Sequence, residues 1–169
     1  MKITWLGNTV FRIHYAGEII LLAIDDAPPD VDLQEIRAGV DRIITPADLA
    51  NLPQHDGTSS SRPLRLIDDP QTGLTVRSIG DHAVMFSESS EDDLVFTWNT
   101  LDALPASGAV LILSGELSSL TNIDGISNAR PTLIGLAFPE TEIPPLAELA
   151  ARLPGIPLQI LEPGLAIEV

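Results

Sequence analysis

The feature that most constrains the fold of this chain is its succession of short apolar runs, each closed by glycine, proline or acidic residues. The longest run, residues 18–24, stops at Asp25. In the run at 10–15, apolar side chains at every second position alternate with Arg12 and His14. This period of two is typical of a strand with one buried face. The pattern therefore predicts a protein built mainly from short β-strands.

The same criteria predict strands along the whole sequence, with turns at the breaks between them. These expected strands cover residues 3–6, 10–15, 18–24, 41–45, 64–67, 74–79, 82–86, 93–97, 109–113, 132–136, 158–161 and 165–169. The runs at 109–113 and 132–136 are continuously apolar, as in strands that are covered on both faces.

Three short helices are expected between the strands. The first covers residues 31–38, with Asp30 as its N-cap and Gly39 at its end. The second covers residues 47–52, because Thr45 and Pro46 have the order of an N-cap followed by proline at the first helical position. The third covers residues 145–153, whose leucines recur at helical spacing. Residues 54–62 are polar and serine-rich and read as a surface loop.

Length and composition limit the classes of protein that fit. A chain of 169 residues is expected to form one domain, residues 1–169. It has 24 acidic residues against nine Lys and Arg, a net charge of -15, so neither nucleic acid nor an anionic membrane is an expected partner. It has no cysteine, which excludes disulfides and thiolate chemistry. No membrane-spanning run or signal peptide is recognisable, so we expect a cytoplasmic protein.

The opening residues resemble a known family. The start Met1-Lys2-Ile3-Thr4-Trp5-Leu6-Gly7, followed by apolar segments at 11–13 and 20–22, resembles the metallo-β-lactamase superfamily. It is most similar to the branch of L-ascorbate-6-phosphate lactonase-like, metal-dependent hydrolases. The resemblance implies an α+β fold, a four-layer αββα sandwich, here shortened and with reduced helices. In that family the metals lie at one edge of the sandwich and are held by loops.

The resemblance does not extend to the residues with which the family binds metal. Active members carry the motif Thr-His-x-His-x-Asp-His after a strand, and the four ligand positions read here Pro46, Asp48, Ala50 and Asn51. Asn8 follows Gly7 where this branch usually has histidine. The resemblance therefore implies that the zinc ligands have been lost.

Two further ligand positions are also altered. The segment 96–100 resembles an apolar-x-Gly-Asp-Thr motif, and its metal-binding aspartate is replaced by Asn99. Ala137 or a neighbour stands where the family has its last ligand histidine. The candidate residues for a vestigial cleft are Asn8, Asp25, Asp48, Asn51, Asp81, His82 and Asn99.

Several of these candidates also have structural explanations. Asp48 falls in the first turn of a short helix, where a carboxylate favours the positive end of the helix dipole. Asp25 can cap the turn before Pro28, and Asn8 is a natural turn residue. Asp81 and His82 follow a glycine and can form a turn. His14 and His55 are expected to be solvent-exposed.

The favoured function is that of a non-catalytic protein, a pseudoenzyme, with a binding or assembly role through the vestigial cleft or the sandwich edges. No catalytic residue and no cofactor is expected. The partner is an unknown small ligand or protein, and a homodimer is one possibility. The alternative is a divergent metal-dependent hydrolase with a rebuilt, carboxylate-rich site for zinc or another divalent metal. It requires Asp48, Asp81 and His82 to converge within ligand distance.

Overall fold

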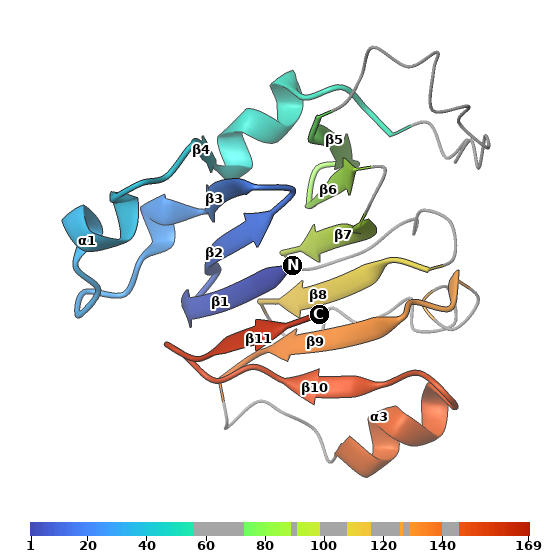
Figure 1. The fold of residues 1–169 in the computed structure, drawn as a ribbon. Coiled ribbons are helices and arrows are strands. Elements are labelled where there is room, and N and C mark those ends of the chain that lie inside the picture. Colours follow the sequence, from blue (N-terminus) through green and yellow to red (C-terminus); the bar gives the residue numbers. More distant parts are fainter. Residues whose placement is uncertain (56–72, 89–90, 99–107, 116–125, 127–128, 140–145) are drawn as a thin grey trace.

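A computed structural model describes the chain from Met1 to Val169, apart from residues 56–72, 89–90, 99–107, 116–125, 127–128 and 140–145. The described residues form two β-sheets, one of five strands and one of six. Figure 1 shows the two sheets stacked face to face, with both chain ends close together.

The five-stranded sheet is built from the first part of the chain and its last strand. Its strands are β1 (Lys2–Gly7), β2 (Val10–Tyr15), β3 (Glu18–Leu22), β4 (Arg42–Ile44) and β11 (Ala166–Glu168). They lie in the order β11-β1-β2-β3-β4. All pairs are antiparallel except β3 with β4, which is parallel. Ala16 and Gly17 turn the chain between β2 and β3 with φ angles of 51° and 80°, as a tight hairpin turn requires.

The six-stranded sheet is built from the rest of the chain. Its strands are β5 (Thr75–Ile79), β6 (Ala83–Glu88), β7 (Glu91–Thr97), β8 (Val110–Ser114), β9 (Leu133–Ala137) and β10 (Leu158–Ile160). They lie in chain order, antiparallel from β5 to β7 and parallel from β7 to β10. Every residue of β8 is buried, as expected for a central strand covered on both faces.

The main core lies between the sheets. The alternating apolar side chains of β1 and β2 face those of β6 and β7 in a single cluster. Its centre is aromatic, with the rings of Phe11 and Phe96 4.8 Å apart and that of Phe86 meeting Phe96 edge-on. Such tilted pairs add stability beyond the apolar area they bury. The alternation of apolar and polar side chains along the strands therefore explains why the two sheets pack together.

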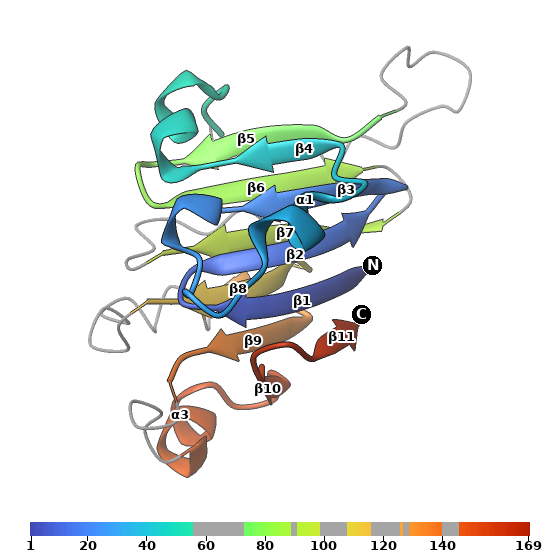
Figure 2. The ribbon, with the colours of Figure 1, turned by 90° about the vertical axis from the view of Figure 1, so that its left-hand side faces the viewer.

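Helices cover the outer faces and complete four layers. The helix α1 (Leu33–Arg37) and the residues after it pack Ile36 and Val40 on the outer face of the five-stranded sheet. The helix α3 (Leu146–Arg152) packs Leu149 against the outer face of the six-stranded sheet, as does Leu153 just beyond it. The protein is thus a shortened α+β sandwich with reduced helices, as the sequence predicted. Figure 2 shows α1 in front of the five-stranded sheet.

Some local predictions need correction. Strand β3 ends at Leu22 rather than residue 24, because Ala23 turns left-handed and the 3-10 turn η1 (Ile24–Asp26) begins. Asp32, not Asp30, caps α1, because its carboxylate accepts the N–H groups of Gln34 and Glu35. The predicted strand at 64–67 lies outside the described residues. Within the part of the chain that is described, no helix is long and apolar enough to span a membrane.

Candidate functional site

One edge of the sandwich gathers most of the residues that the sequence singled out. Strands β1, β3 and β4 run in one direction, and β5, β7, β8 and β9 run together in the other sheet. The 3-10 helix η2 (Pro46–Asn51), which follows β4, leads to residues that pair with the end of β5 through a bridge from Gln54 to Ser78. The carboxyl ends of these strands therefore meet at one edge, here called the carboxyl-end edge (Figure 2).

Asn8 lies in the β1–β2 turn at this edge and is held in place by its neighbours. Its φ angle is 46°, its carbonyl accepts the indole N–H of Trp5 at 2.9 Å, and its side-chain amide donates to the carbonyl of Asp26 at 3.0 Å. The Asp26 carboxylate in turn accepts the N–H and the hydroxyl of Thr9, at 3.2 and 2.7 Å. These contacts bind the turn to η1, so the Asn8 amide already serves a structural purpose.

The carboxylate of Asp48 is also hydrogen-bonded to a neighbouring residue. Its carboxylate accepts the N–H of Thr45 at 2.8 Å and the Thr45 hydroxyl at 2.7 Å, in a capping box at the start of η2. The Thr45 N–H bond, followed by the bond from its hydroxyl, lowers the pKa of Asp48. A carboxylate held in this way stabilises the helix start. The prediction that Asp48 belongs to the first turn of a short helix is thus confirmed.

Four other candidates are exposed at the same edge. Asp25 lies in η1, Asn51 ends η2, and Asp81 and His82 form the β5–β6 turn after Gly80. None of the four side chains makes a hydrogen bond or ion pair with the described part of the chain. The seventh candidate, Asn99, lies outside the described residues. The edge therefore combines side chains engaged in structure with others that face solvent.

The floor of this edge is apolar. Trp98, directly after β7, is only 6% exposed and belongs to the inter-sheet cluster that also holds Trp5 and Leu49. By the resemblance, Trp98 stands where the family motif has glycine. Its indole N–H has no hydrogen-bond partner among the described residues. The burial of Trp98 was not predicted, because the resemblance concerns the neighbouring position, Asn99.

His55 does not behave as predicted. Its ring nitrogens are shielded from solvent and have no partner within the described segments, whereas the sequence suggested an exposed loop. The reason is that the His55 backbone N–H donates to the Ser78 carbonyl at 2.8 Å, which holds residues 53–55 beside β5. The hydroxyl of Ser78 points to the Leu52 carbonyl at 3.4 Å.

A zinc site of the family type does not fit the residues found here. Of the four motif positions only Asp48 can carry a charge, and its carboxylate is taken up by Thr45. Zinc requires about three nitrogen, sulfur or carboxylate ligands around an open position. The described residues contain no group of three or more His, Asp or Glu side chains that could hold a metal ion. The convergence of Asp48, Asp81 and His82, which the alternative hypothesis required, is therefore not found.

The comparisons with known proteins agree with this fold. No protein-family model and no curated protein sequence matches the chain. Among solved structures, the chain is similar to an isothiocyanate hydrolase from Delia radicum gut bacteria, with a TM-score of 0.58 and 14% identity over 99% of each chain. It is also similar to Igni18, a metallo hydrolase from the hyperthermophilic archaeon Ignicoccus hospitalis KIN4/I, with a TM-score of 0.54 and 15% identity over 99% of this chain and 98% of that chain.

These similarities cover the whole length of the three chains but rest on few identical residues. They show that the protein has a metallo-hydrolase-like fold, and at this identity they show the fold alone. The specific branch that the sequence resembled stays a prediction.

Proposed function

We propose that this protein is a non-catalytic relative of the metallo-hydrolases that acts by binding a partner or ligand at its carboxyl-end edge. The observation that carries the proposal is the state of Asp48. It is the one ionisable group among the four motif positions, and both of its short contacts go to Thr45. A metal ion would have to compete with the helix cap for this carboxylate.

Three further features support loss of hydrolysis. Asn8, which stands at a histidine position of the family, is bonded to the carbonyl of Asp26. The neighbouring Asp26 carboxylate is bonded to Thr9. Trp98 fills the floor under the edge with apolar volume. Each feature engages a side chain in structure at this edge, which leaves fewer groups to hold a reacting water.

The side chains left for binding are the exposed ones. Asn51 and His82 offer hydrogen-bond groups, and Asp25 and Asp81 offer carboxylates, all without partners among the described residues. Residues of this kind, placed on turns above a rigid sheet, are typical of recognition surfaces. A protein or small ligand that contacts them is therefore the proposed partner, and a second copy of the chain is one form that this partner can take.

A turnover assay with a matched variant tests the loss of chemistry. The protein is assayed against phosphoester and lactone substrates with Zn²⁺, Mn²⁺ or Mg²⁺ present, beside Asp48→Ala and the control Asp92→Ala. Asp92 lies near the start of β7, at the opposite end of that strand from the carboxyl-end edge. The proposal predicts the same background rate for all three proteins. Metal-dependent turnover that disappears only in Asp48→Ala would refute it and restore the hydrolase hypothesis.

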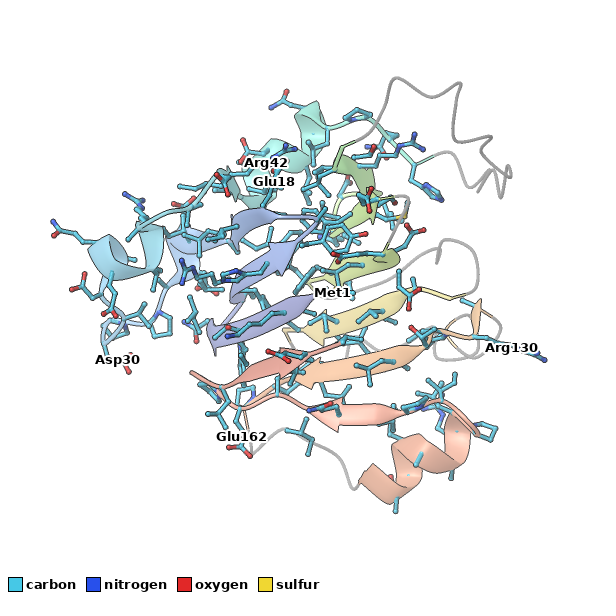
Figure 3. The ribbon with its side chains drawn as sticks, in the orientation of Figure 1. Met1, Glu18, Asp30, Arg42, Arg130 and Glu162 are labelled. Atoms are coloured by element: carbon cyan, nitrogen blue, oxygen red, sulfur yellow. The ribbon has the colours of Figure 1, made fainter. Side chains whose placement is uncertain are left out.

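Sedimentation velocity tests assembly at the edge. If the protein self-associates through this surface, His82→Glu is expected to dissociate it, because a second carboxylate beside Asp81 repels an acidic partner. Arg130→Gln, before the start of β9 and so at the opposite end of the strands (Figure 3), is the control. Self-association that survives His82→Glu would place the interface elsewhere.

A further inference from the structure

Another interaction surface lies along β10, at one margin of the six-stranded sheet. The two described sheets end in the edge strands β4, β5, β10 and β11. An edge strand exposes unpaired backbone groups, and proteins usually protect it with charged residues or cover it with another segment. β4, β5 and β11 carry Arg42, Arg77 and Glu168, and residues 53–55 also cover part of β5. β10 carries no charged residue, so it is the least protected of these edges.

The backbone of β10 presents hydrogen-bonding groups on its outer side. The carbonyl of Pro157 and the N–H of Leu161 both bond to β9, at 2.9 and 2.8 Å. Successive residues of a strand point their N–H and C=O groups to opposite sides. Leu158 and Ile160 therefore point theirs away from β9, to the side where no described strand pairs with β10.

The side chains of β10 leave an apolar surface beside this edge. Leu158 packs, together with Ile156, against the cluster that α3 forms on the outer face of the sheet. The side chain of Ile160 points to the same face, because it lies two residues further along the strand. It is nevertheless 37% exposed. The described layer thus covers the start of β10 and leaves its end bare.

A second copy of the chain complements this edge. In an antiparallel pair around a two-fold axis through Gln159, Leu158 of each copy lies opposite Ile160 of the other. These are the residues whose backbone groups point outward, so each of the two pairs can exchange two hydrogen bonds. The same pairing sets the exposed Ile160 side chain beside Leu158 of the other copy, at the part of β10 that α3 covers. A self-complementary patch of this kind is typical of two-fold dimers.

The charges around β10 also suit a second copy. The net charge of -15 makes two copies repel each other unless their contact is free of acid or pairs acid with base. The same register sets Glu162 of one copy opposite Ile156 of the other. Arg152, the last residue of α3, lies close to Ile156 in sequence, and a bond from the Ile156 N–H to the Leu153 carbonyl turns the chain there.

Neither of these two charges is used within its own chain. Arg152 and Glu162 are exposed, and their side chains make no ion pair among the described residues. Figure 3 shows Glu162 well apart from α3 in one copy. The two-fold axis brings Arg152 of each copy toward Glu162 of the other, so the uncharged strand pair is flanked by two contacts of opposite charge.

We propose that β10 pairs with β10 of a second copy of this chain, in antiparallel fashion, and that the two six-stranded sheets become one continuous sheet. The backbone bonds of Leu158 and Ile160 form the centre of the interface, and the contacts between Arg152 and Glu162 flank it. β10 and β5 are opposite edges of the sheet, so the β5–β6 turn stays free. The dimer is therefore independent of the proposed function at the carboxyl-end edge.

Sedimentation equilibrium of the full chain from about 1 μM to 1 mM tests the strand pairing. We expect a monomer–dimer equilibrium. Ile160→Pro removes an outward N–H and no bond to β9, so the dissociation constant should rise about tenfold or more, because symmetry removes two hydrogen bonds. Ile160→Val keeps the N–H and should stay within about twofold of the wild type. Ile43→Pro, at an exposed isoleucine of the edge strand β4, is the matched control and should not change the dimer. His82→Glu should not change it either, which separates this interface from the carboxyl-end edge.

Charge reversal tests the same interface without altering the strand. Glu162→Arg lowers the net negative charge, so a non-specific effect would strengthen association, whereas the proposal predicts a dissociation constant about three- to tenfold higher. Arg152→Glu should weaken the dimer at least as much, and the double variant should return to within about twofold of the wild type. The proposal is overturned if the wild type is monomeric up to about 1 mM. It is also overturned if Ile160→Pro dimerises like Ile43→Pro, or if the double variant is no tighter than the single variants.

Discussion

Two regions of the carboxyl-end edge differ in how they use polar side chains. Around the β1–β2 turn and the start of η2, Asn8, Asp26 and Asp48 are bonded to the chain itself. On the β5–β6 turn, Asp81 and His82 are exposed and have no such contacts with the described residues. The comparison teaches that polar residues gathered at one edge of a fold are not all available for binding or chemistry.

The largest effect is expected from Gly7→Ala, which strains the backbone at the end of β1, at the carboxyl-end edge. Gly7 has a φ angle of 105°, and an added Cβ would lie 2.7 Å from Cγ of Pro28. Strain and clash together should lower the free energy of unfolding by about 2–4 kcal/mol. Gly17→Ala is the control, because its φ is 80° but nothing lies within 4 Å. Urea unfolding measures both, and equal losses would show that the Pro28 contact is unimportant.

The next effect is expected from Asp26→Ala, which cuts the bonds between η1 and the β1–β2 turn. Loss of both contacts to Thr9 should cost about 1–2 kcal/mol of unfolding free energy. Asp25→Ala, on the neighbouring residue without side-chain contacts to the described residues, should change stability by less than about 0.5 kcal/mol. If the two variants have the same stability, the turn does not depend on Asp26.

A smaller effect is expected from Asp48→Asn, which weakens the capping box and should cost about 0.5–1 kcal/mol near neutral pH. The pKa of Asp48 is lowered in the folded state below its ordinary value of 3.8. Its stabilisation is therefore present above about pH 4 and is lost as the pH falls through the lower folded pKa. The difference between wild type and variant should shrink in acid. Unfolding from pH 7 to pH 2 measures this, and a difference that stays constant over that range would contradict the prediction.

The smallest effect on stability is expected at Lys2 and Glu168, which lie opposite each other on β1 and β11. Lys2→Gln and Glu168→Gln remove exposed charges without contacts to the described residues, so each should change the free energy of unfolding by less than about 0.5 kcal/mol. A loss of stability above about 1 kcal/mol in either variant would mean that these charges support the sheet.

Much of the fold could be predicted because its signals are local. Alternation in β2, the Ala16–Gly17 turn and the Thr45–Pro46 helix start each depend on a few neighbouring residues. Exposure was harder to predict. Ile43 is apolar but 44% exposed, because β4 is an edge strand and apolar character does not tell whether a face is covered.

The candidate site was predictable only in part. The resemblance placed Asn8 and Asp48 at one edge. The bond of Asp48 to Thr45 is local, whereas the bond of Asn8 to Asp26 depends on where η1 lies in space. His55 became shielded through pairing with β5, which no local pattern indicates. The juxtaposition of Lys2 and Glu168 could not be predicted, because it depends on the register between two strands from opposite ends of the chain.

Metal content tests the central claim most directly. The protein is purified without chelator, incubated with Zn²⁺, Mn²⁺ or Mg²⁺, passed through a desalting column and analysed for metal, together with Asp48→Ala. Because Asp48 is held by Thr45 and the other motif positions carry no charge, we predict far less than one metal ion per chain in both proteins. Retention of about one or two ions per chain, as in metallo-hydrolase sites, and their loss in Asp48→Ala would contradict the account.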